Sequence, residues 1–197
     1  MKDTKSFIPD LKELGGLVLG FLPWMLFLFF SGHTLLSLKI AVVISLLASI
    51  TLGFSDLKRG LILSWGTCIF FIVCLILVNF MNNVWMAREM DLVSNLALAA
   101  IMWFTVIIGK PFALQYARRG LPKEKWNDEN FIRGCMFITV VWASLMTFAV
   151  LLSILRRTTW LPFANWVYFD LTILNIVIGL TFTTIFKRKK RLQRENA

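Results

Sequence analysis

Two charged side chains fall inside stretches of the sequence that are otherwise apolar, and their types would allow proton or ion chemistry. Lys39 and Asp170 each lie a few residues within such a stretch. A charge placed among lipid chains costs about 2.5–3.5 kcal/mol on insertion scales, so each residue needs a partner or a task. Three roles are compatible with their positions: an ion pair joining two helices, the coupling of proton or ion movement, or snorkelling of both side chains to the interface.

Three asparagines lie in similar surroundings. Asn79, Asn95 and Asn175 belong to different apolar stretches. Polar side chains inside membranes join helices by hydrogen bonds worth roughly 0.6 kcal/mol each. We therefore expect the three amides to connect helices. Asn175 also follows Asp170 at about one helical turn, on nearly the same face, so it belongs to the candidate transport site as well.

The remaining residue types favour neither a metal centre nor a known catalytic site. His33 is the only histidine, which excludes a bis-histidine haem held by this chain alone. Cys68, Cys74 and Cys135 lie within apolar stretches and lack a CxxC spacing, so we predict that they are packing residues. The H-E-x-x-H, G-x-S-x-G and P-loop patterns are absent from the sequence. We expect no metal and no cofactor, and the sequence offers no support for an enzymatic activity.

The elements that must position these residues are membrane helices. Hydrophobic residues make up 58% of the chain and charged residues 16%, whereas soluble domains carry roughly 45–50% and about 25%. Six apolar runs each approach the roughly 20 residues that cross a bilayer as a helix. We predict an all-α, polytopic membrane helix bundle with six transmembrane helices, or five if Pro23 makes the first run re-entrant. The predicted spans are residues 14–32, 34–54, 61–80, 92–109, 134–155 and 167–186.

The distribution of basic residues predicts the orientation of the chain. Of the 21 lysines and arginines, 17 fall on one side of the predicted membrane, 3 on the other, and Lys39 lies within a run. Basic residues accumulate on the cytoplasmic side, so residues 1–13, the loop 110–133 and the tail 187–197 are predicted to be cytoplasmic. The same asymmetry explains the net charge of +10 with the lipid bilayer as partner and without nucleic acid. Acidic residues ahead of the first run argue against a cleavable signal peptide.

The predicted cytoplasmic loop 110–133 contains candidate contact residues. Its first part, Pro111–Arg119, predicts a short helix at the inner interface that ends before Gly120. One interpretation makes this loop a contact for a protein partner or a lipid headgroup, and the other makes it a basic topological loop. The candidate contact residues are Gln115, Arg118, Arg119 and Trp126.

Two adjacent carboxylates close this loop. Asp128 and Glu129 precede the fifth apolar run. Carboxylates are favoured in the first turn of a helix, where the backbone N–H groups point toward them. We therefore predict that both lie at the N-terminus of the fifth helix and that Asn127 is its cap.

Several short strings of residues resemble those of a known family. They are Phe21-Leu22-Pro23 in the first run, Lys110-Pro111 after the fourth, Trp126 before the fifth, and Trp160-Leu161-Pro162 with Asn165-Trp166 before the sixth. Together with the order of the runs, they resemble the intracellular septation protein A family. The resemblance implies a small bacterial inner-membrane protein that contacts other envelope proteins, in roles concerning cell division, envelope synthesis and envelope integrity. It carries no catalytic residues over to this chain.

Three functional hypotheses follow. The first is a non-enzymatic scaffold or accessory protein of the bacterial cell envelope, placed in the inner membrane, which binds envelope membrane proteins or itself. The second is a small transporter or channel that uses Lys39 and Asp170. The third is a lipid-modifying or lipid-handling enzyme in which Arg118 and Arg119 hold a headgroup, although no acid–base or nucleophile set accompanies them.

Overall fold

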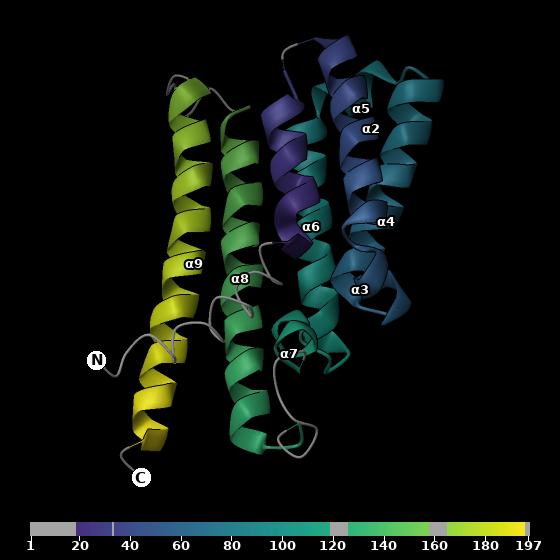
Figure 1. Ribbon diagram of the computed structural model, residues 1–197. Helices are drawn as coiled ribbons and strands as arrows, with labels where there is room; N and C mark the ends of the chain where they lie inside the picture. Colours follow the sequence, from purple (N-terminus) through teal and green to yellow (C-terminus); the bar gives the residue numbers. More distant parts are fainter. Residues whose placement is uncertain (1–18, 33, 119–125, 158–164, 196–197) are drawn as a thin grey trace, which may run out of the picture.

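The computed structural model describes residues 19–32, 34–118, 126–157 and 165–195, and the regular structure of these residues is helical throughout. The longer helices stand side by side, and the short ones lie at the ends of this bundle (Figure 1). The longer helices are the first helix (Leu19–Phe30), α2 (Leu35–Thr51), α4 (Ile62–Cys74) with its π-helical continuation η1 (Leu75–Phe80), α6 (Met90–Ile107), α8 (Glu129–Leu155) and α9 (Asn165–Glu195). The short helices are α3 (Phe54–Lys58), α5 (Val84–Arg88) and α7 (Phe112–Ala117). The predicted all-α class is confirmed.

Three helical segments are long and apolar enough to cross a membrane. They are α4 with η1, α6 and α8, with 19, 18 and 27 residues. The first helix, α2 and the stretch Ile173–Phe186 of α9 are also apolar but shorter. Because about 20 helical residues are needed to cross about 30 Å of hydrocarbon, the described residues provide three candidate spans by length and composition, fewer than the six predicted.

The first helix continues through Pro23, where the sequence predicted a kink or a break. Proline has no N–H to donate to the carbonyl four residues earlier, which here belongs to Leu19. The described residues on both sides of Pro23 are helical, so the helix accommodates the missing hydrogen bond without a break. Thr34 caps the next helix by accepting a hydrogen bond from the Ser37 backbone at 3.1 Å. His33, between the two helices, lies outside the described residues.

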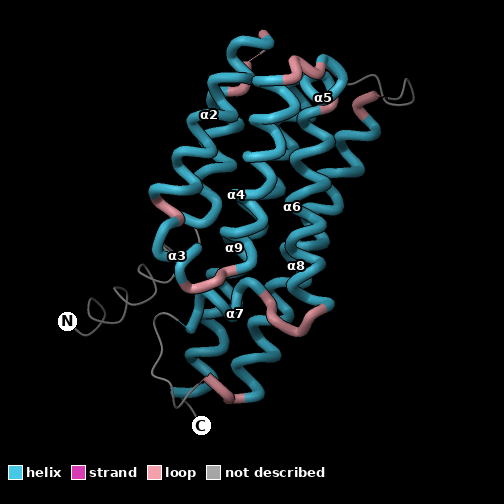
Figure 2. The backbone as a smooth tube through the Cα atoms, turned by 90° about the vertical axis from the view of Figure 1, so that its right-hand side faces the viewer, coloured by secondary structure: helices cyan, strands magenta, loops and turns pink. Residues whose placement is uncertain are grey.

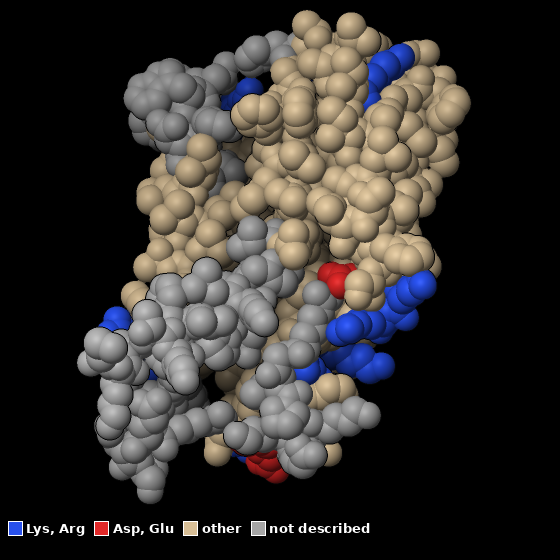
Figure 3. Space-filling model, viewed as in Figure 1, with Lys and Arg blue, Asp and Glu red and all other residues tan. Residues whose placement is uncertain are grey.

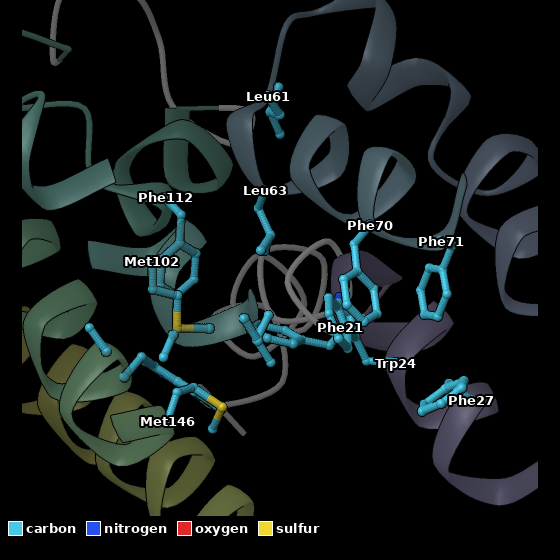
Figure 4. Close-up of a cluster of buried hydrophobic side chains, with 14 of the residues drawn as sticks. Phe21, Trp24, Phe27, Leu61, Leu63, Phe70, Phe71, Met102, Phe112 and Met146 are labelled. Carbon is cyan, nitrogen blue, oxygen red and sulfur yellow. The ribbon is translucent and has the colours of Figure 1, made fainter. Parts of the chain in front are cut away.

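Aromatic side chains of the first helix form the centre of the core (Figure 4). Phe21 stacks on Trp142 of α8 with ring centroids 5.3 Å apart, and Trp24 stacks on Phe70 of α4 at 4.9 Å. Trp24 Nε1 also donates to Thr67 Oγ1 at 2.9 Å, which pairs the one polar group of the indole. The first helix therefore links α4 to α8 through contacts that are almost entirely apolar.

The helix α7 is buried within the protein. The chain leaves α6 through Gly109, whose φ of 67° is the left-handed conformation that glycine adopts without strain. Phe112, Leu114 and Tyr116 of α7 are all buried. The prediction of a short helix here is confirmed, with Pro111 as its cap. The apolar side chains of α7 face the protein, and its predicted position at the membrane interface stays a prediction.

The start of α8 carries the two carboxylates as predicted. Asp128 caps the helix by accepting hydrogen bonds at 2.9 and 3.3 Å from two backbone N–H groups of the first turn. Glu129 follows in that turn and pairs with Arg133 at 3.2 Å. Asp128 therefore provides the cap that was predicted for Asn127, since its carboxylate accepts two N–H groups at once.

The two ends of the bundle differ in charge. One end carries α3, α7 and the start of α8 and is called the α7 end; the other carries α5 and the end of α8 and is called the α5 end (Figures 1 and 2). Basic side chains gather near the α7 end, below a broad surface without charge (Figure 3). The exposed basic residues toward this end are Lys58, Arg59, Lys110, Arg133, Arg188 and Lys189. This is the end that the sequence predicts to be cytoplasmic.

Close packing of α9 on α8 generates the first prediction. A Cβ added at Gly179 would lie 3.0 Å from the Trp142 ring and 3.1 Å from Leu145, whereas one added at Gly134 would meet only Phe186 at 3.6 Å. Alanine improves helix propensity by about 1 kcal/mol at both sites, but overpacking costs typically 1–3 kcal/mol. We expect Gly179→Ala to unfold at lower temperature than Gly134→Ala in detergent, as measured by tryptophan fluorescence. Equal unfolding temperatures would contradict the close α8–α9 contact.

Candidate functional site

Lys39 lies at the α5 end, one turn into α2. Its ammonium donates a hydrogen bond to Asn82 Oδ1 in the turn that follows η1. Asn82 has a φ of 49°, a left-handed conformation that asparagine tolerates better than most residues. The partner predicted for Lys39, Asp170, belongs to α9, but its side chain lies outside the described residues. The Lys39–Asp170 pair therefore stays a prediction, and Asn82 is the contact that the structure gives Lys39.

The three asparagines join helices, as predicted. Asn79 Nδ2 donates to the backbone oxygen of Lys39 in α2 at 3.2 Å, and Asn95 Nδ2 donates to Ser153 Oγ of α8 at 2.9 Å. Asn175 Nδ2 donates to a backbone oxygen of α8 at 2.7 Å. Asn79 Oδ1 is buried and has no hydrogen-bond partner within the described ranges. Each of these amides donates to a neighbouring helix. Among the described side chains, the three amides do not line a common polar channel.

An ion network that was not anticipated from the sequence lies at the α5 end. Arg157 pairs with Glu89 and with Asp91, the latter through Nη2 and Oδ1 at 2.7 Å. Arg156 Nη1 lies 3.5 Å from Asp91 Oδ2. The four side chains are between 18% and 41% exposed, so water screens these pairs only in part. We call these four residues the α5-end ion network.

A signal for this network was present in the sequence. Two acids lie next to the start of the fourth apolar run, and two arginines follow the fifth run. Both positions are on the predicted outer side, so antiparallel α6 and α8 had to bring them to the same end. The network therefore depends on charges at the start of one helix and the end of its antiparallel neighbour, which no pattern along a single helix reveals.

Gln115 connects two segments at the α7 end. Its Oε1 accepts a hydrogen bond from the Ile62 backbone at 2.9 Å, and its Nε2 donates to the Lys110 backbone oxygen at 2.7 Å. Nearby on α7, Tyr116 Oη lies 3.2 Å from Ser64 Oγ. The Gln115 amide, predicted as a contact for a partner or lipid, is therefore occupied on both sides by the chain itself.

Arg118 and Trp126 contact each other across the loop that precedes α8. Arg118 Nη2 donates to the Trp126 backbone oxygen at 3.2 Å, and its guanidinium carbon lies 5.4 Å from the centroid of the indole. A cation over an indole contributes about 0.5–1 kcal/mol at exposed sites. Arg119 lies outside the described residues. Arg118 and Trp126, both predicted as contacts for a partner or lipid, thus bind each other at the α7 end.

One apolar pocket, of about 60 Å³, lies between the first helix, α6, α8 and α9. Its two polar wall residues already make hydrogen bonds: Ser94 Oγ donates to the Asp91 backbone oxygen at 3.1 Å, and Asn95 donates to Ser153. The rest of the wall is almost entirely apolar, so the pocket suits hydrocarbon and not a polar substrate. We call it the α6–α8 pocket. Its apolar wall includes Trp24, Leu28, Leu98, Met146, Ala149 and Ile176.

Metal ligands do not gather in the described parts of the chain. No group of three or more His, Cys, Asp or Glu side chains there could hold a metal ion. Cys68, Cys74 and Cys135 are buried and free, which agrees with their predicted packing role.

No family model, curated protein or solved structure matches the chain. The resemblance to the intracellular septation protein A family therefore stays a prediction. The function must be inferred from the geometry of the chain itself.

The α5-end ion network generates the second prediction. Arg157→Met would leave Glu89 and Asp91 partly buried and without their main cation. An exposed ion pair contributes about 0–1 kcal/mol to the free energy of unfolding, and disruption of a buried pair costs about 3–5 kcal/mol. We expect the cost for a partly exposed pair to lie between these values. We expect a loss of about 2 kcal/mol for Arg157→Met, measured by denaturant unfolding in detergent.

A matched control is available at the other end of the bundle. Arg133 pairs with Glu129, and both side chains are 78% exposed. Arg133→Met should change stability by less than about 0.5 kcal/mol, because water already solvates both charges. If the two variants lose the same stability, the network does not contribute to holding α6 against α8.

Proposed function

We propose that the chain is a non-enzymatic scaffold or accessory protein of a bacterial inner membrane. The observation that carries the proposal is the use of the intramembrane polar side chains. Asn79, Asn95 and Asn175 each bind another helix, and Trp142 Nε1 donates to Thr183 Oγ1 of α9 at 3.0 Å. Polar groups that hold a bundle together leave its outer surface for contacts with partners.

The proposed topology has six spans with both termini in the cytoplasm. Six apolar helical segments support it: the three candidate spans and the shorter first helix, α2 and Ile173–Phe186 of α9. The exposed basic residues toward the α7 end support its cytoplasmic placement, because anionic lipid attracts such residues by about 1 kcal/mol each. At the α5 end, Arg156 and Arg157 are offset by acidic partners.

The proposed partner surface lies around α3 and the turn that precedes α7. Lys58, Arg59 and Lys110 are exposed there, and Lys58 lies over the Phe54 ring at 4.4 Å. Charged groups at the rim of an interface mainly set the encounter rate and the choice of partner. The resemblance to the septation protein A family favours proteins of division and envelope synthesis as partners.

The other two hypotheses have weaker geometric support. A transporter needs a polar route, but the pocket described in the bundle is apolar and Lys39 contacts Asn82. A headgroup-modifying enzyme would need Arg118 available, but its guanidinium lies on Trp126. The scaffold is therefore the function that the contacts favour.

The experiment is crosslinking in cells, followed by gentle detergent purification of the tagged chain and mass spectrometry. We expect envelope membrane proteins to be recovered with the wild-type chain. Replacing Lys58, Arg59 and Lys110 together by glutamine should lower that recovery by about tenfold, since each rim charge contributes up to about 1 kcal/mol. These side chains are exposed, so the amount of folded chain should stay the same.

The matched control removes equal charge on the α8–α9 side. Arg133, Arg188 and Lys189, each replaced by glutamine, should leave partner recovery within about twofold of the wild type. A labelled C-terminus in both variants verifies that topology has not changed. Recovery of the wild-type chain alone, or only with itself, would contradict the scaffold proposal.

A further inference from the structure

The α6–α8 pocket and the α5-end ion network form one continuous column along α6 and α8. Ser94 and Asn95 of the pocket wall follow Asp91 by three and four residues, so they lie on the same face of α6 one turn below it. On α8, Asn95 binds Ser153, which precedes Arg157 by one turn. An apolar pocket therefore leads directly to a partly exposed cluster of charges.

The depth of the pocket corresponds to lipid hydrocarbon. Ala149 in its wall lies eight residues before Arg157, or about 12 Å along the helix at 1.5 Å per residue. The charged cluster would then lie near the headgroups and the pocket among the acyl chains, whose hydrocarbon layer is about 30 Å thick. Leu28, at the rim of the pocket, is 44% exposed, so a chain in the bilayer can reach the pocket from the side.

The charges of the ion network fit a headgroup that carries both signs. Arg156 and Asp91 pair with each other at 3.5 Å, but the guanidinium stays 41% exposed and the carboxylate 35% exposed. The exposed side of the guanidinium can meet a phosphate while the pair is kept, and the exposed side of the carboxylate can meet an ammonium group. A headgroup with only negative charge would meet Glu89 and Asp91 without a compensating cation of its own. Zwitterionic phospholipids present phosphate and ammonium together.

We propose that the α6–α8 pocket holds a few methylene groups of one acyl chain of a zwitterionic phospholipid whose headgroup binds the α5-end ion network. The lipid occupies a structural position between the first helix, α8 and α9, distinct from the lipids that surround the bundle. This site does not depend on the proposed scaffold function, because it requires only the purified chain.

The experiment uses the full chain in vesicles with a photoactivatable phosphatidylethanolamine that carries a diazirine on its acyl chain. Crosslinked peptides are located by mass spectrometry, and phosphatidylglycerol with the same acyl chain is compared. We expect phosphatidylethanolamine to label the pocket wall preferentially. Ala149→Phe fills the pocket and should lower that labelling about tenfold, which corresponds to the contacts of one or two buried methylene groups.

Three further variants keep the test decisive. Leu151→Phe lies on the exposed face of the same helix, where Leu151 is 51% exposed, and should leave pocket labelling unchanged. If Ala149→Phe does not fold, Leu28→Trp blocks the rim from an exposed position and should lower the labelling in the same way. Glu89→Gln with Asp91→Asn removes both carboxylates and should shift the preference toward phosphatidylglycerol.

Three outcomes would overturn the proposal. Labelling spread evenly over the exposed helix faces would mean surrounding lipid only. Pocket labelling that survives both Ala149→Phe and Leu28→Trp would place the acyl chain elsewhere. Equal labelling by the two headgroups in the wild-type chain would refute the zwitterionic assignment.

Discussion

The organisation of this protein depends on one constraint: polar groups enclosed by apolar side chains find no water and must pair within the protein. Helices satisfy the backbone, and the side chains follow the same rule. Asn95 binds Ser153, and the indole N–H of Trp24 binds Thr67. Each such bond has a fixed partner on another helix, so the polar residues determine which helix faces lie together, while the more numerous apolar contacts leave that choice open.

The first helix illustrates how aromatic packing complements this rule. Its described part covers Leu19–Phe30, and within it Phe21 and Trp24 contact α8 and α4 through stacked rings. Stacked and edge-on rings prefer particular geometries, worth about 0.5–1.5 kcal/mol beyond their buried area. A few directional contacts from one helix can therefore orient the two helices that it touches.

The helical class, the basic α7 end and the helix-joining role of the asparagines followed from composition, charge and the cost of burying polar groups. The burial of α7 did not, because Phe112 and Tyr116 among basic residues also suit an interfacial helix, and only the positions of α6 and α8 decide between the two. The α5-end ion network was missed for a similar reason. Glu89 and Arg157 are far apart in the sequence, and their contact depends on how two helices are paired.

The hydrogen bonds of Gln115 have a consequence for the order of assembly. Its acceptor side binds the start of α4, 53 residues earlier, and the neighbouring Ala113 backbone donates to Thr139 Oγ1 of α8, 26 residues later, at 3.3 Å. During synthesis, α4 is available before α7 is made, but Thr139 emerges only afterwards. Docking of α7 can therefore be completed only once α8 has been made, so the burial of α7 is a late step that closes one end of the bundle.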